Sequence, residues 1–124
     1  MSSFHRFDVP EDSQAVNELH DVMDGSSACV VILVMKGCGF CSAMSGAISE
    51  VEEALSGPDA PPGSVVVVDS EVASQSPRSI LQASAFPTIR ATTPDGVEIP
   101  VMDRSATGIL SALAEAHSLS LIHI

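Results

Sequence analysis

The sequence predicts an α/β fold, in which a central mixed β-sheet of four to five strands is flanked by α-helices. Two continuous runs of mostly β-branched residues, 28–35 and 64–69, are typical of strands buried on both faces of a parallel sheet. Apolar residues at helical spacing lie between these two runs. An Asp95-Gly96 pair in the last third of the chain predicts a late β-hairpin, which a C-terminal helix follows.

The first third of the chain predicts a short strand, a helix and a buried strand. Residues 4–9 form the short strand, and Pro10 with the acidic residues after it suits the first turn of a helix. Apolar residues then recur every three or four positions until Gly25 ends the helix. Residues 28–35 form the first strand of the sheet interior.

The middle third predicts a helix, a second buried strand and a short helix. Apolar residues three and four apart predict a helix over residues 38–55, which Gly57-Pro58 ends. It begins at the first cysteine of Cys38-Gly39-Phe40-Cys41. The second buried strand is 64–69, and Ser76-Pro77 is suited to cap a short helix that includes Ile80 and Leu81.

The last third predicts two strands and a helix. A strand starts at residues 86–89 and turns at 93–96 into a second strand over 97–101. Apolar residues from 106 to 116 then predict an amphipathic helix, with Asp103 or Ser105 as its N-cap. The apolar residues beyond it are expected to extend this helix over the core or to mediate self-association.

Length, charge and cysteine count indicate the general class of protein to which the chain belongs. The chain has 124 residues, of which 45% are hydrophobic, and this predicts one domain over 1–124 with its core at about 11–117. Sixteen Asp and Glu against five Lys and Arg give a net charge of −11, which argues against nucleic-acid and membrane-surface partners. Three cysteines are too few for a secreted disulfide framework, and the N-terminus has no apolar signal segment. We therefore expect a soluble cytoplasmic protein.

The two cysteines at 38 and 41 carry the chemistry that the sequence predicts. A cysteine that opens a helix lies near unpaired amides, which favour a thiolate and lower its pKa. Lys36, the single lysine, adds a positive charge two residues earlier. Cys41, one turn inside the helix, is more buried and suits attack on a mixed disulfide formed at Cys38.

Two other interpretations of this cysteine pair stay open. The pair resembles half of a zinc site, although Cys29 and the four histidines do not complete a zinc-finger spacing. It is also compatible with two inert core cysteines. A CxxC that follows a strand in an α/β pattern favours redox chemistry without a metal. Cys29, at the start of the first buried strand, is expected to be a small buried hydrophobe.

Three features of the sequence together resemble the thioredoxin family. These are the apolar strand that leads into the Cys38–Cys41 motif, the valine-rich strand that ends in Asp69, and Phe86-Pro87-Thr88 followed by the Asp95-Gly96 turn. The resemblance covers roughly residues 11–117. It implies a thioredoxin-like fold.

The resemblance also implies a role for each motif residue. In the family, the first cysteine attacks a target disulfide and the second releases it, while a cis-proline segment beside them pairs with the substrate backbone. In this chain these roles fall on Cys38, Cys41 and Phe86-Pro87. Without the cysteine motif, Phe86-Pro87 would be interpreted as an ordinary strand edge. Gly39 and Phe40 tune the reduction potential. Phe40 and Phe86 would form an apolar patch that docks a partner.

The motif departs from that of typical thioredoxins. Gly37 stands in place of the Trp before the first cysteine, and Phe40 in place of the Pro between the cysteines. Ile32 occupies the position of the buried acid, so a proton acceptor for Cys41 is not visible in the sequence. Cys-Gly-Phe also resembles the monothiol glutaredoxin signature, but the glutathione-site segment after the proline strand is missing.

The expected activity is that of a thiol:disulfide oxidoreductase acting on protein substrates through the Cys38/Cys41 dithiol. It needs no bound cofactor or metal, but it needs an external reductant such as thioredoxin reductase or glutathione. A monomer is expected, and a weak dimer is the alternative. The alternatives are a glutaredoxin-like, glutathione-dependent reductase and a binding module with little turnover.

Overall fold

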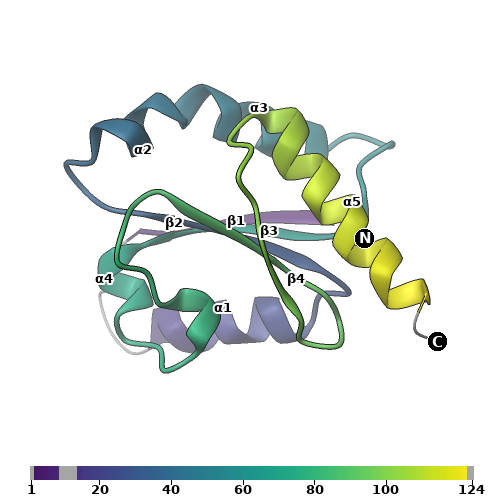
Figure 1. The fold of residues 1–124 in the computed structure, drawn as a ribbon, viewed down its shortest axis with the longest axis horizontal. Helices are drawn as coiled ribbons and strands as arrows, with labels where there is room; N and C mark the ends of the chain where they lie inside the picture. The colour runs from purple at the N-terminus through teal and green to yellow at the C-terminus, as the bar shows by residue number, and fades with distance from the viewer. Residues whose placement is uncertain (1, 9–13, 123–124) are drawn as a thin grey trace.

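The computed structural model describes residues 2–8 and 14–122, which form a five-stranded sheet between two helical layers (Figure 1). The strand order is β1-β3-β2-β4-β5. β1, β2 and β3 are parallel, and β4 and β5 add antiparallel pairings. The predicted mixed sheet with a late hairpin is thus confirmed. The strands are β1 (Ser2–Phe7), β2 (Cys29–Val34), β3 (Gly63–Asp69), β4 (Thr88–Thr92) and β5 (Glu98–Pro100).

Helices cover both faces of this sheet because its central strands are apolar on both sides. Alternate residues of β2 point to opposite faces, so Ile32 packs with α3 and α5 whereas Val31 packs with α1 and α4. In the described part of the chain, no helix is both long and apolar enough to cross a membrane. The helices are α1 (Gln14–Asp24), α2 (Gly39–Ala43), α3 (Ser45–Leu55), α4 (Ser70–Ala73), the 3-10 helix η1 (Ser79–Leu81) and α5 (Ala106–Ile122).

The helix predicted over residues 38–55 is two helices, and that prediction was wrong. Met44 ends α2 and precedes α3, and its N–H donates to the carbonyl of Cys41 at 3.1 Å, one residue short of α-helical spacing. Its side chain is nevertheless buried in the same core as Ile48 and Val51. The spacing of apolar residues therefore continues without change across Met44. For this reason the hydrophobic pattern alone cannot reveal the break between α2 and α3.

Other boundaries differ by a few residues from the prediction. The short helix α4 directly follows β3, where none was predicted, because Asp69 caps it by accepting the N–H of Glu71 at 2.9 Å. Ser76 accepts the N–H of Arg78 at 3.2 Å, and η1 begins after it. The start predicted for the first helix, at Pro10, lies outside the described residues.

The last helix starts where the sequence predicted. The hydroxyl of Ser105 accepts the N–H of Gly108 at 3.0 Å, and Asp103 accepts the N–H of Ser105 at 2.9 Å. Of the two predicted caps, Ser105 thus caps the helix, while Asp103 fixes the turn before it. The helix continues to Ile122, beyond the predicted residue 116.

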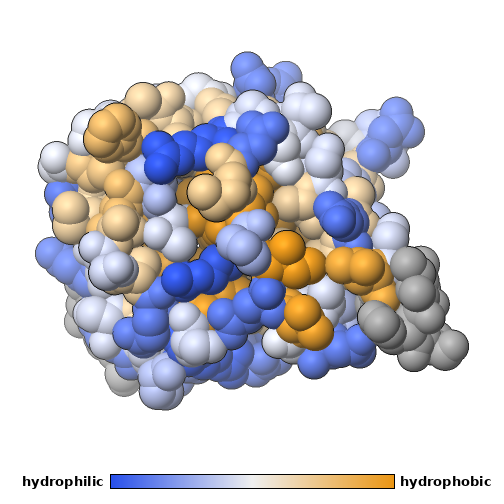
Figure 2. All heavy atoms as spheres, in the orientation of Figure 1, coloured by the Kyte–Doolittle hydropathy of each residue, from blue (hydrophilic) through white to orange (hydrophobic). Residues whose placement is uncertain are grey.

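Some large apolar side chains remain on the surface. Figure 2 shows apolar groups between hydrophilic ones on the face that carries β4 and α5. The exposed large hydrophobic residues in the described part of the chain are Met35, Phe40, Val97 and Met102.

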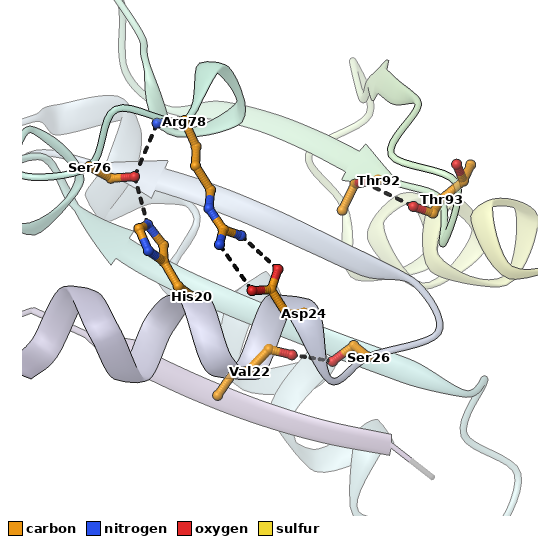
Figure 3. A network of polar contacts seen from close by, with 8 residues as sticks. All are labelled: His20, Val22, Asp24, Ser26, Ser76, Arg78, Thr92 and Thr93. Atoms are coloured by element: carbon orange, nitrogen blue, oxygen red, sulfur yellow. Dashed lines mark hydrogen bonds and ion pairs between the residues drawn. The ribbon is translucent and has the colours of Figure 1, made fainter.

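A polar network ties the end of α1 to the segment that follows α4 (Figure 3). The two guanidinium nitrogens of Arg78 donate to the carboxylate of Asp24 at 2.8 and 3.0 Å. His20 shares a hydrogen bond of 2.8 Å with the buried hydroxyl of Ser76. Burial and the nearby Arg78 lower the pKa of His20, which favours its neutral form. This network fixes the start of the chain segment that leads to Phe86.

Gly63, the first residue of β3, offers a test of this packing. Its φ of +120° suits glycine, and an added Cβ would lie 2.5 Å from the carbonyl oxygen of Ala28 and 2.8 Å from Leu113. We expect Gly63→Ala to lower the free energy of unfolding by about 2 kcal/mol or more. Urea unfolding followed by far-UV circular dichroism measures this.

Gly46, in α3, is the matched control. An added Cβ there meets no atom within 4 Å, so Gly46→Ala should raise the free energy of unfolding by about 0.5 kcal/mol. Equal unfolding midpoints for Gly63→Ala and the parent chain would contradict the close approach of β3 to Ala28 and Leu113.

Candidate functional site

Cys38 lies at the edge of the sheet where the parallel strands end. β2 ends at Val34, and Gly37, with φ of +79°, turns the chain toward α2. Cys38 is the N-cap of α2, and its Sγ accepts the N–H of Cys41 at 3.1 Å. A local turn thus places a hydrogen-bond donor on the sulfur of Cys38.

The two cysteines have pKa values shifted in opposite directions. The pKa of the Cys38 thiol is lowered, first by a hydrogen bond from the Cys41 side chain and then by the N–H groups of Cys41 and Phe40. Burial, followed by that same hydrogen bond to Cys38, raises the pKa of Cys41, whose side chain is 9% exposed. Of the two thiols, Cys38 therefore loses its proton at the lower pH, and Cys41 keeps its proton to a higher pH.

A second segment, distant in sequence, lies against Cys38. The peptide bond between Phe86 and Pro87 is cis, which is the isomer that the family resemblance implies. The carbonyl oxygen of Phe86 lies 3.5 Å from Cys38 Sγ. Pro87 is buried and Phe86 is half-buried. The fold thus brings Cys38, Cys41, Phe86 and Pro87 into one site.

The other residues predicted for the site surround the dithiol. Gly39 is the first residue of α2, and Phe40 after it is 72% exposed. Lys36 is exposed and forms an ion pair of 3.7 Å with Glu71. The cation whose charge lowers the pKa of both cysteines is Arg104, which lies 6.0 Å from the centroid of the Phe40 ring.

Sequence reasoning missed Arg104 because it is far from the motif along the chain. It lies in the segment between β5 and α5, and only the tertiary fold places it beside Phe40. The sequence signal that was available is its position in a loop just before a predicted helix, and many surface arginines share that position.

A cavity of about 290 Å³ opens beside Cys41. Asp69, at the end of β3, lines the same cavity as Cys41 and is 4% exposed. One of its carboxylate oxygens accepts the N–H of Glu71. The sequence analysis treated Asp69 only as a strand end, although an acid directly after a buried parallel strand lies at the same sheet edge as Cys38. Asp69 is thus a carboxylate that the sequence analysis did not connect with Cys41.

Cys29 belongs to the core and not to the site. Its side chain is 1% exposed, and burial raises its pKa to about 12. It packs with Leu19 and Val31 on the α1 face of the sheet, as a small buried hydrophobe does. Within residues 2–8 and 14–122, no three His, Cys, Asp or Glu side chains gather where they could hold a metal ion.

Comparison with known proteins supports this fold. No protein-family model matches the chain, and no curated protein matches its sequence. The structure is similar to the first thioredoxin domain of mouse protein disulfide-isomerase A4, with a TM-score of 0.67 and 19% identity over 82% of this chain and 71% of that domain. It is also similar to the thioredoxin of Malassezia sympodialis, with a TM-score of 0.56 and 16% identity over 94% of this chain and 91% of the other.

A third similar structure is a larger fragment. The J-Trx1 fragment of ERdj5 matches with a TM-score of 0.62 and 12% identity, over 91% of this chain and 52% of the fragment. This chain thus spans about half the length of that fragment. These structures are thioredoxin domains, and the chain has the thioredoxin fold that its sequence resembles.

The opposite pKa shifts predict how the three thiols react. In the reduced protein we expect iodoacetamide to modify Cys38 first, with a rate midpoint at a lower pH than an ordinary thiol, because only thiolates react. Cys41 should react more slowly, and Cys29 only after unfolding. Peptide mapping by mass spectrometry at several pH values measures each site.

Cys38→Ser provides the control for this experiment. It should remove the fast reaction and leave Cys29 protected. Modification of Cys41 as fast as that of Cys38 at pH 7 would contradict the hydrogen-bond arrangement described above.

Proposed function

We propose that this protein is a thiol:disulfide oxidoreductase whose nucleophile is Cys38 and whose resolving thiol is Cys41. The observation that supports it most is the arrangement around Cys38 Sγ, which accepts the N–H of Cys41 at 3.1 Å and lies against the cis Phe86-Pro87 segment. A stabilised thiolate next to an open backbone segment suits attack on an extended peptide disulfide. Two similar structures are named a disulfide isomerase domain and a thioredoxin.

The reaction proceeds in two exchanges. The Cys38 thiolate attacks one sulfur of the substrate disulfide, forms a mixed disulfide and releases the other substrate sulfur as a thiolate. Cys41 then loses its proton and attacks Cys38 Sγ, which releases the second substrate sulfur. The substrate gains two electrons, and the protein becomes a Cys38–Cys41 disulfide. An external reductant, either a reductase such as thioredoxin reductase or two molecules of glutathione that become one oxidised glutathione, returns the Cys38–Cys41 disulfide to the dithiol.

Protein disulfides are the proposed substrates. Phe86 presents its carbonyl beside Cys38, where an extended substrate strand can pair with the backbone. Phe40, which is largely exposed next to the nucleophile, adds apolar surface for the same partner.

Trapping of mixed disulfides tests the proposed roles of Cys38 as nucleophile and Cys41 as resolving thiol. Cys41→Ser should accumulate mixed disulfides between Cys38 and its targets, because the resolving attack is lost. The adducts can be captured after an acid quench and identified by non-reducing electrophoresis and mass spectrometry. Cys38→Ser, the matched control, should yield none. Absence of adducts with Cys41→Ser, both in cells and with a model disulfide peptide, would rule out the oxidoreductase.

We further propose that Asp69 accepts the proton that Cys41 loses. Burial raises the pKa of Cys41, so its attack needs a base. Asp69 lines the same cavity of about 290 Å³, and the buried acid typical of the family is replaced by Ile32. A carboxylate that shares this cavity can take the proton directly or through water.

The effect of Asp69→Asn tests this role. Asparagine can still cap α4, so the fold should persist. With an aromatic disulfide that releases a coloured thiolate in each exchange, the first phase reports Cys38 and the second reports Cys41. We expect the second phase to slow about tenfold or more at pH 7 while the first is unchanged. Equal second-phase rates for both proteins from pH 6 to 8 would exclude Asp69 as the acceptor.

A second candidate function is a binding module with little turnover. The observation in its favour is the exposed apolar surface near the dithiol, where Phe40 is 72% and Met102 is 88% exposed. A binding module would retain its partner after Cys38→Ala. The oxidoreductase instead requires the sulfur.

A further inference from the structure

Four of the five cations in this chain are already bound by other groups of the protein. Three form ion pairs with acidic side chains, and one donates its guanidinium to backbone carbonyls. These contacts are Arg6 with Glu52 at 3.4 Å, Lys36 with Glu71 at 3.7 Å, Arg78 with Asp24 at 2.8 Å, and Arg90 with the carbonyl of Ile80 at 3.0 Å.

Arg104 is the exception. Its guanidinium lies 6.0 Å from the Phe40 ring centroid, and it forms neither an ion pair nor a hydrogen bond with any residue of 2–8 or 14–122. Its neighbour Asp103 forms no ion pair with it, and one carboxylate oxygen of Asp103 instead accepts the N–H of Ser105 at 2.9 Å. Although the chain has sixteen acidic residues, Arg104 stands next to the dithiol with no acidic partner among those that the structure describes. Its donors are therefore open to an external anion.

A groove connects Arg104 with the proline segment. This groove, of about 250 Å³, is lined in part by Pro87, Ile89, Val101, Met102 and Arg104. Met102 is 88% exposed, and the face that carries β4 and α5 shows apolar groups interrupted by hydrophilic ones (Figure 2). The groove starts at Pro87, whose neighbour Phe86 contacts Cys38 Sγ. A peptide paired beside Cys38 can extend directly into it.

We infer that the substrate segment recognised here carries an acidic residue close to its disulfide cysteine, which pairs with Arg104, and an apolar residue that packs on Met102 and Phe40. The charge complementarity of this groove supports that choice, because a guanidinium forms two parallel hydrogen bonds with a carboxylate. The inference rests on the proposed function and specifies its substrate class.

The overall charge of the protein leads to the opposite expectation. A net charge of −11 favours basic partners at long range. A preference for acidic segments would thus be a property of the groove alone. An experiment can therefore distinguish recognition by the groove from attraction by the net charge of the protein.

The test uses three disulfide peptides that differ at one position. Two residues from the cysteine they carry Glu, Gln or Lys. On the other side of the cysteine, all three have the same Leu. Exchange rates are measured for the parent chain, Arg104→Gln and Arg104→Glu. Each rate is divided by that for hydroxyethyl disulfide, a small neutral probe, because Arg104 also lowers the pKa of Cys38. Asn17→Asp makes the net charge more negative by the same amount at an exposed position of α1, away from the groove and from the dithiol, and serves as the control.

The expected result is a graded preference. The parent chain and Asn17→Asp should favour the Glu peptide over the Gln peptide, and the Gln over the Lys peptide, by about two- to fivefold per step, which is the range for an exposed ion pair. Arg104→Gln should abolish this preference, and Arg104→Glu should reverse it. Equal rates for the three peptides, or a parent preference for Lys, would overturn the inference.

Binding measurements separate this inference from the proposed function. The same peptides with serine in place of cysteine are titrated into Cys38→Ser and followed by fluorescence anisotropy. Failure of the parent chain to reduce hydroxyethyl disulfide would refute the proposed oxidoreductase function but not the proposed recognition of acidic segments. The order of affinities for Glu, Gln and Lys peptides would still support or overturn the role of Arg104.

Discussion

β2 and β3 pair in parallel from Cys29 beside Ser64 to Val34 beside Asp69, and both strands are buried on their two faces. Because parallel strands end at the same edge, the chain leaves β2 toward Cys38 at the place where β3 ends in Asp69. Helices cover both faces, so this edge is where functional side chains gather. Cys38, Cys41 and the buried carboxylate of Asp69 are all positioned by this pairing.

The chemistry at this edge comes from two environments a few residues apart. Cys38 lies at a helix start, where the N–H of Cys41 points at its sulfur. Cys41 lies one turn further on and is buried beside a cavity. The same hydrogen bond between the two side chains lowers one pKa and raises the other. One short turn thereby gives two identical thiol side chains pKa shifts of opposite sign.

The fold class and the cysteine pair could be predicted because both depend on local patterns. Residues 28–35 and 65–68 are apolar without interruption, and the spacing of Cys38 and Cys41 is that of one helical turn. The break at Met44 could not be predicted, since its side chain keeps the apolar period. The short helix α4 could not be predicted either, because its four residues are too few to show a period.

The surroundings of the dithiol depend on tertiary contacts and were only partly predictable. The approach of Phe86 to Cys38 came from the family resemblance, since the two residues are 48 positions apart. Arg104 and Asp69 have ordinary sequence contexts, and only the fold shows that they lie near the cysteines. Lys36, the cation nearest in sequence, is paired with Glu71 instead. Proximity in sequence was thus a poor guide to the electrostatics of the site.

The position of Cys29 limits which disulfides the folded chain can form. It begins β2, while Cys38 follows the other end of that strand, and the five residue steps from Cys29 to Val34 alone span about 17 Å at the usual rise of a strand. Such a separation is far beyond the reach of a disulfide. Within one folded chain Cys29 therefore cannot form a disulfide with Cys38, so an internal disulfide at Cys38 can join it only to Cys41.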